Sequence, residues 1–260
     1  MTMIRTALIG GASKGLGFGC AEALAQKSRR IVMCARDESD LDAAAHALRS
    51  QYPAVDVIAI PCDWSKKEAL MQLQTTLQSK NINIDILINN VGGPMPGTIS
   101  QQNEKSWEEA LDLLFRSTIR VYAMVLPGMR ARKWGRIVNI LSTTAIEPSP
   151  LLATSSVVRA ALASHAKLTA WDVAKDGVTV NSLMPAGFLT ARTNQLIDDA
   201  AQRRSVDRDA IVKEKEAELP SGHFMNPIEL GYVAAFLASD EAAGITGTLF
   251  PVDGGAKKSL

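Results

Sequence analysis

The chain has 260 residues, and its 28 basic and 27 acidic side chains leave a formal net charge of +1 at pH 7. Such a balance lacks the basic footprint that nucleic acid or an anionic membrane surface attracts, so neither is expected as a partner. A small-molecule substrate fits better, and α/β proteins of this length commonly form one domain, here expected over residues 1–260.

Cysteines and histidines give no sign of a metal site or a disulfide framework. The three cysteines form no CxxC pair and lie in apolar segments, as buried thiols do in a reducing cytoplasm. The histidines lack the spacing of metal ligands. Neither a signal peptide nor a run of membrane-spanning length is recognisable. The sequence therefore predicts a cytoplasmic protein without a metal.

Short apolar runs alternate with longer amphipathic segments along the whole chain. The apolar runs, at residues 6–10, 30–35, 55–60, 84–89, 135–141, 178–183 and 248–253, have no polar alternation, which is typical of strands buried on both faces. The segments between them have the period and length of crossover helices: Leu16–Lys27, Ser39–Ser50, Lys66–Lys80, Ser106–Arg132, Ser155–Lys175 and Pro227–Ala238. We therefore predict an α/β fold, a doubly wound parallel sheet of about seven strands with helices on both faces.

One segment interrupts this rhythm. Residues Ala191–Glu218 carry dense charge and no strand signal. The segment is either a lid over a substrate site, spanning about residues 189–222, or a solvated helical excursion.

A glycine-rich loop follows the first predicted strand. In "ALIGGASKGLG" the glycines Gly11, Gly15 and Gly17 stand between that strand and the first helix. Glycines at this place let backbone N–H groups approach a pyrophosphate, to which the helix N-terminus adds partial positive charge. The loop predicts a dinucleotide cofactor.

The end of the second strand bears on the choice of cofactor. In "VMCARD", Ala35 and Arg36 stand where an acidic residue would hold the ribose hydroxyls of NAD. Arg36 and the nearby Lys14 suit a 2′-phosphate instead, which favours NADP(H) over NAD(H). The alternative is that both are solvated surface charges.

Further segments follow at matching distances: "CDW" with Asp63, "NNVGG" from Asn89 to Gly93, "GRIVNILS" ending in Ser142, "VTVNSLMPAG" and "ITGTLFPVDGG". With the glycine loop they resemble the classical type of the short-chain dehydrogenase/reductase family over Thr6–Gly255, and within it the 3-oxoacyl-[acyl-carrier-protein] reductases. The resemblance implies a Rossmann-like fold, a nicotinamide cofactor, a carbonyl or alcohol substrate and, in many members, a homotetramer. It implies cofactor contacts from Gly11, Ser13, Lys14, Gly15, Leu16, Gly17, Arg36, Asp63, Asn90, Gly92, Arg159, Pro185, Gly187 and Thr190.

The chain departs from the family at its catalytic residues. Of the usual Asn, Ser, Tyr and Lys, only the serine is retained, as Ser142, and Leu114, Ser155 and Arg159 stand at the other three places. A serine hydroxyl is a weaker acid than a phenol, and losing a positioned general acid lowers a rate by about 10²–10⁴-fold. We expect Ser142, Ser155 and Arg159 to be the catalytic residues. For the last two, the alternative is an ordinary helix N-cap region with a surface arginine.

Two smaller departures lie on cofactor contacts. Gly10 stands where the family usually has threonine, and Ala186 follows Pro185 where it usually has glycine, which comes one place later as Gly187. Two functions remain open: an NADP(H)-dependent oxidoreductase, or a catalytically silent protein that binds the cofactor as a sensor or partner subunit.

Substrate and assembly are predicted less closely. Residues that line the substrate pocket are expected among Gly93–Met95, Ile146, Leu151 and Phe188. The two long helices resemble those that pair between subunits of the family, and apolar side chains recur along them at Leu114, Ile119, Ala163 and Ala170.

Overall fold

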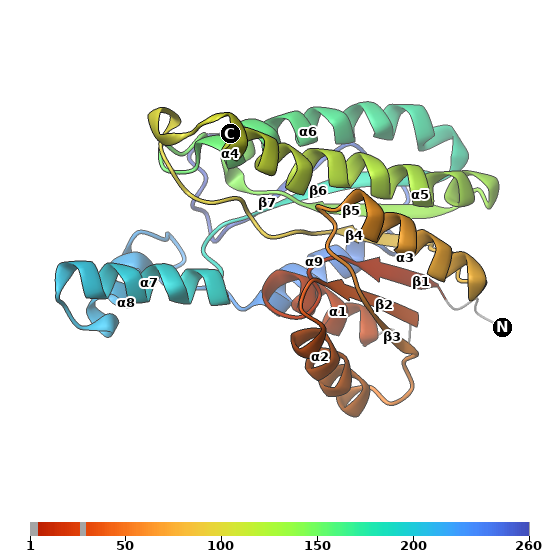
Figure 1. Ribbon diagram of the computed structural model, residues 1–260, viewed down its shortest axis with the longest axis horizontal. Helices are drawn as coiled ribbons and strands as arrows, with labels where there is room; N and C mark the ends of the chain where they lie inside the picture. The colour runs from red at the N-terminus through yellow and green to blue at the C-terminus, as the bar shows by residue number, and fades with distance from the viewer. Residues whose placement is uncertain (1–4, 27–29, 260) are drawn as a thin grey trace.

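The computed structural model describes residues 5–26 and 30–259. Its strands form one seven-stranded sheet in the order β3-β2-β1-β4-β5-β6-β7 (Figure 1), and every pairing is parallel. The strands are β1 (Thr6–Ile9), β2 (Arg30–Ala35), β3 (Val57–Pro61), β4 (Ile86–Asn89), β5 (Gly135–Ile140), β6 (Val178–Pro185) and β7 (Leu249–Val252). The predicted Rossmann-like, doubly wound sheet is confirmed.

Helices cover both faces of this sheet (Figure 1). They are α1 (Gly15–Ala25), α2 (Glu38–Gln51), α3 (Lys67–Ser79), α4 (Glu104–Ala110), α5 (Ser117–Ala131), α6 (Ala153–Val173), α7 (Ala191–Arg204), α8 (Arg208–Ala217) and α9 (Pro227–Leu237). Every predicted crossover segment is helical, with ends that differ by a few residues. The predicted end of the first helix at Lys27 lies outside the described residues.

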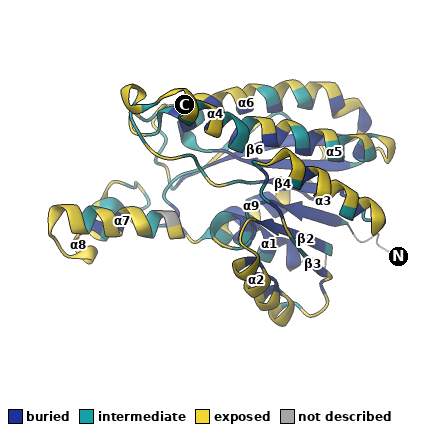
Figure 2. Ribbon diagram, in the orientation of Figure 1, coloured by how far each residue is buried: buried dark blue, intermediate teal, exposed yellow. Residues whose placement is uncertain are grey.

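The core has two layers because successive strand side chains point to opposite faces of the sheet. On β1, Ala7 and Ile9 pack with residues of α1, α2 and α9, whereas Leu8 packs with residues of α3, α5 and α6. The inner strands are buried on both faces (Figure 2), whereas the edge strands β3 and β7 are only partly buried. The three cysteines are free and buried, as expected. Within the described residues, no helix has the length and apolar character needed to cross a membrane.

The sheet changes direction between β1 and β4. The chain runs outward through β2 and β3, then returns to pair β4 against β1, with Ile9 opposite Ile88. The glycine loop after β1 therefore lies beside Asn89 and Asn90, and the Gly10 amide donates to the Ile88 carbonyl at 3.1 Å. In open α/β sheets the carboxyl edge at such a reversal is where ligands bind.

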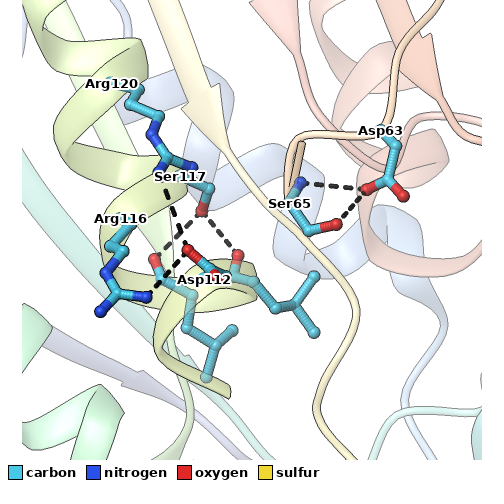
Figure 3. A network of polar contacts seen from close by, with 8 residues as sticks. Asp63, Ser65, Asp112, Arg116, Ser117 and Arg120 are labelled. Atoms are coloured by element: carbon cyan, nitrogen blue, oxygen red, sulfur yellow. Dashed lines mark hydrogen bonds and ion pairs between the residues drawn. The ribbon is translucent and has the colours of Figure 1, made fainter. Parts of the chain in front are cut away.

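The segment predicted as one helix over Ser106–Arg132 has a wide turn in its middle. Between α4 and α5, residues Leu111–Arg116 form a π-helix. The Ser117 hydroxyl bonds the carbonyl oxygens of Leu113 and Leu114 at 2.6 and 3.2 Å (Figure 3), and Asp112 pairs with Arg116 at 3.1 Å. Hydrophobic period alone does not reveal such a turn, since the apolar face continues through it.

The predicted pairing face of the long helices is wrong in part. Leu114 and Ala170 are buried inside the chain itself, because Leu114 packs in a cluster with residues of α6, and Ala170, on α6, belongs to the core cluster on one face of the sheet. Of the four residues, only Ile119 has a largely exposed side chain, at 41%.

The charged segment forms the helices α7 and α8, which extend beyond the carboxyl edge of the sheet and pack mainly on each other (Figure 1). Ile197 of α7 and Ile211 of α8 are buried, and the Arg208 guanidinium pairs with Asp198 at 2.8 Å. The chain segments that lead into α7 and out of α8 are joined by a hydrogen bond, in which the Met225 amide donates to the Gly187 carbonyl at 2.8 Å.

Candidate active site

A cleft of about 590 Å³ opens at the carboxyl edge of the sheet. The loops that follow β1 to β6 line it, together with the first two turns of α6 and α7. Nearly all predicted site residues come together here, including Ser142, Ser155 and Arg159. Of the expected pocket residues, Gly93 and Phe188 line the cleft, whereas Met95, Ile146 and Leu151 are exposed beyond its lining. The predicted cofactor contacts that line it are Gly11, Ser13, Lys14, Gly15, Leu16, Arg36, Asp63, Asn90, Gly92, Arg159, Pro185, Gly187 and Thr190.

The glycine loop leaves an open space in the cleft that side chains at the glycine positions would fill. Gly11 and Gly15 have φ of +56° and +58°, a region that favours glycine. A Cβ on Gly11 would lie 2.7 Å from the Asn90 amide nitrogen. Gly17 is the one predicted contact that does not line the cleft, and a Cβ there would lie 2.2 Å from the Gly11 carbonyl oxygen. Its role is to let α1 pack closely under the loop.

The start of α1 suits a phosphate group. Lys14 is the N-cap residue and makes no side-chain cap, so the first backbone N–H groups of the helix lack an internal acceptor. Lys14, Gly15 and Leu16 line the cleft at this helix end. These residues fit the pyrophosphate of a dinucleotide.

Charged side chains gather where the adenosine end of such a cofactor would lie. The Lys14 ammonium pairs with the Asp40 carboxylate at 3.0 Å, and Arg36 is exposed at the end of β2. The Asp63 carboxylate accepts hydrogen bonds from the Ser65 amide and hydroxyl at 3.0 and 2.7 Å (Figure 3). This turn fixes the Asp63 side chain at the wall of the cleft.

The two serines lie on different elements and share one property. Ser142 follows β5, and its hydroxyl oxygen accepts a hydrogen bond from the Thr144 amide at 3.2 Å. Ser155 lies in the first turn of α6, and its oxygen accepts one from the Arg159 Nε at 3.2 Å. Because each oxygen accepts, each O–H remains able to donate to a further acceptor.

Arg159 is not a surface residue, so that alternative was wrong. Its side chain is buried, and its Nη1 donates to the carbonyl oxygens of Ile140 and Leu141 at 3.0 and 2.8 Å. These carbonyls lie at the carboxyl end of β5, directly before Ser142. The N-cap of α6 is Leu152, and Ser155 lies in the first turn after it, within the predicted N-cap region. Arg159 therefore ties the start of α6 to the end of β5.

A family model described as enoyl-(acyl carrier protein) reductase matches residues 11–257. The chain belongs to the short-chain dehydrogenase/reductase family. It is 30% identical over 252 residues to the D-beta-hydroxybutyrate dehydrogenase of Cupriavidus necator, and the match covers 96% of this chain and 97% of that relative.

Solved members of the family have the same fold. The L-sorbose reductase of Gluconobacter frateurii, in complex with NADPH and L-sorbose, superposes with a TM-score of 0.94 at 30% identity, over 99% of this chain and 98% of that one. A short chain oxidoreductase of Pseudomonas aeruginosa PAO1 with NADPH bound, described as containing an atypical catalytic center, gives 0.88 at 28% identity over 98% of each chain.

The family's usual threonine is absent at Gly10 for a steric reason. A Cβ on Gly10 would lie 2.4 Å from the Asn90 carbonyl oxygen and 2.7 Å from two ring atoms of Trp64. The Trp64 ring is buried and takes the space that a larger residue would need. Sequence reasoning quoted this tryptophan beside Asp63 but gave it no role.

A buried polar network beneath the cleft was also missed. The Asn89 amide donates to Thr118 and Asn139 at 3.0 and 2.8 Å, and the Tyr122 hydroxyl donates to Asn139 at 2.9 Å. Burial raises the pKa of the Tyr122 phenol. This tyrosine stabilises the ends of β4 and β5 and does not line the cleft.

Leu114, the residue expected at the position of the family's asparagine, lies within the π-helix. Its side chain is buried in an apolar cluster with Leu141, Val158 and Leu162. Its carbonyl oxygen accepts a hydrogen bond from the Thr118 hydroxyl at 2.7 Å. The position therefore supplies packing and carries no polar side chain toward the serines.

Proposed function

We propose that this protein is an oxidoreductase that uses NADPH to reduce a carbonyl compound, or NADP⁺ to oxidise the corresponding alcohol. One observation carries the proposal: Ser142 and Ser155 both line the cleft, and the buried Arg159 guanidinium donates to the second hydroxyl. The family and the relatives solved with NADPH support the reaction class and the cofactor.

The cleft has a candidate contact for each part of the cofactor. Lys14 and Arg36 would hold the 2′-phosphate, and the glycine loop with the start of α1 would hold the pyrophosphate. When bound, NADPH supplies the hydride. The remaining contacts, carried over from the family, come from Asp63, Asn90, Gly92, Pro185, Gly187 and Thr190.

The two serines stabilise the oxygen of the substrate. As the carbonyl carbon is reduced, negative charge develops on its oxygen, and the O–H groups of Ser142 and Ser155 donate to it. Arg159 stays protonated and strengthens the Ser155 hydroxyl as a donor. A serine is too weak an acid to surrender its proton, so a water molecule protonates the alkoxide to give the alcohol, and the hydroxide that remains exchanges with solvent.

Kinetics of serine variants test the proposal. Ser142→Ala and Ser155→Ala should each lower kcat by about 10²–10³-fold, the usual worth of one oxyanion donor, while NADPH affinity stays unchanged. The matched control is Ser156→Ala, since Ser156 lies in the same turn but bonds the Leu152 carbonyl and does not line the cleft. Full activity in both cleft variants would contradict the assignment.

The second candidate is a protein that binds NADPH without catalysis. It is favoured by one observation: no tyrosine is among the described residues that line the cleft. Saturable NADPH binding with no turnover of any carbonyl compound would support this candidate over the reductase.

We further propose that α7 and α8 act as a lid and that the chain works as a homotetramer in the cytoplasm. The lid role is supported by Ala191, Thr193 and Leu196 of α7, which line the cleft. Exposed Leu168 and Trp171 on α6, beside the edge strand β7, support a subunit contact.

A further inference from the structure

The charges that line the cleft are divided by strand order. The segments that follow β1, β2 and β3 contribute Lys14, Arg36, Asp37, Asp40 and Asp63. Among the described lining residues, the segments that follow β4, β5 and β6 contribute one charged side chain and a few polar ones, and their larger apolar side chains form an apolar wall. The charged and polar lining residues there, apart from the wall, are Arg159, Asn90, Ser142, Ser155, Thr190 and Thr193. We define the apolar wall by its large apolar side chains. Its members are Val91, Leu113, Leu141, Leu152, Phe188 and Leu196.

Among the lining side chains that the structure describes, Arg159 is the one charged group on the apolar side of the cleft. Its guanidinium is buried and donates to two carbonyls of β5 and its end, and to the Ser155 hydroxyl. These contacts engage the guanidinium with oxygen atoms of the protein itself. A carboxylate on the substrate would lose its water against leucine side chains, which is unfavourable without a facing cation.

Exposed apolar side chains continue this wall past the mouth of the cleft. Met95 and Leu151 lie on two segments that are joined by hydrogen bonds, since the Gly97 amide donates to the Leu151 carbonyl at 2.8 Å. Leu189 and Leu196 are exposed at the start of the lid. An apolar group longer than the pocket would thus still find apolar surface at its far end.

We infer that the substrate is a neutral carbonyl compound whose flanking groups are apolar, an aliphatic chain or an apolar ring. The inference rests on the proposed function and narrows it. It separates this chain from the hydroxy acid and the sugar that the names of two relatives contain. Each methylene buried on the apolar wall should raise kcat/KM about threefold to fourfold.

The test compares matched substrates with NADPH. The straight-chain 2-ketones from 2-butanone to 2-octanone should be reduced with rising kcat/KM. Methyl 4-oxopentanoate should be reduced at least about 100-fold more efficiently than 4-oxopentanoate, and L-sorbose should not be turned over. Equal or faster reduction of the acid or the sugar would overturn the inference.

A charge placed on the apolar wall should reverse part of this preference. Leu196→Arg adds a cation at an exposed lining position of α7, and it should narrow the gap between ester and acid by at least about tenfold. Val206→Arg is the control, because Val206 is also exposed on the lid segment but does not line the cleft. An equal ester-to-acid ratio of kcat/KM in the parent protein and in Leu196→Arg would contradict the idea that the apolar wall determines the preference for a neutral substrate.

If the protein has no reductase activity, ligand binding still tests the inference about the substrate. If no ketone is turned over, the ligands are titrated against the NADPH complex and the cofactor fluorescence is followed. Binding of 2-octanone but not of 4-oxopentanoate supports an apolar ligand even without catalysis. Binding of the acid alone overturns the inference.

Discussion

The Trp64 ring occupies the space that a side chain on Gly10 would need. A side chain on Gly10 would meet a backbone carbonyl, which cannot move away without disturbing β4. Replacing a small residue by a larger one in such a packed place is destabilising even when the backbone conformation is ordinary. The pair shows how one residue constrains another that lies far along the chain.

Gly10→Ala should therefore lower the free energy of unfolding by about 1–3 kcal/mol. Denaturant unfolding measures the change. The control is Gly244→Ala, since a Cβ on Gly244 would meet nothing within 4 Å. Equal stabilities of the two variants would show that Trp64 yields to the added methyl group.

At the residue scale, the sequence predicts which residues come together in the candidate site. It does not predict which atoms those residues contact. The spacing from Ser142 to Ser155 and Arg159 placed these residues in one site because the motif fixes their order along β5 and α6. It could not show that Arg159 is buried against the end of β5, or that Trp64 fills the space above Gly10. Such facts depend on pairs of segments that only the folded chain brings together.

At the scale of elements, a histidine of α6 packs against the π-helix and α5. The His165 ring lies 5.8 Å from the Phe115 ring and 5.4 Å from the Tyr122 ring, and its buried Nδ1 has no hydrogen-bond partner. Burial lowers the pKa of His165. The folded protein therefore takes up this proton at lower pH than the unfolded chain, whose histidine has a pKa of about 6.5.

Stability should depend on pH for this reason. The contribution of neutral His165 is fully present above the unfolded pKa and is lost as the pH falls through the lowered folded pKa. Urea unfolding should show a lower midpoint at pH 5.5 than at pH 7.5, and His165→Met should reduce that difference. An identical difference in both proteins would mean that other groups carry the dependence.

The seven strands and the crossover helices were predictable because uninterrupted apolar runs and amphipathic periods are local properties of the sequence. The π-helix was not predictable, since Ser117 and the two carbonyls it bonds look like any helical positions. The pairing face of α5 and α6 was predicted wrongly in part, because period alone does not tell which apolar residues face the chain's own core.

At the scale of the whole molecule, an apolar groove remains open along the edge of the sheet. It lies between α6 and the strands β6 and β7, and Leu168 and Trp171 are exposed there at 60% and 68%. The Lys167 ammonium lies 5.7 Å from the Trp171 ring centre. Large apolar side chains of this kind beside an edge strand are typical of protein contacts.

Light scattering should therefore give the mass of four chains of 27.9 kDa at micromolar concentration. Trp171→Glu should shift the mass to a smaller species because it would bury a charge in the contact. Met71→Glu is the control, since Met71 is exposed on α3, away from the groove. A monomeric parent protein would refute the assembly.

The charged and apolar sides of the cleft meet at the junction of β1 and β4. The preference for a cofactor and the preference for a substrate can therefore be redesigned independently. We expect Arg36, in the segment after β2, to select the 2′-phosphate of the cofactor, and Leu196, in the segment after β6, to select the substrate, while other proposed cofactor contacts such as Gly187 also follow β6. Free-energy effects of substitutions that share no partner usually add. A variant that accepts NADH and a variant that accepts a new ketone could thus be developed in separate libraries and then combined in one chain.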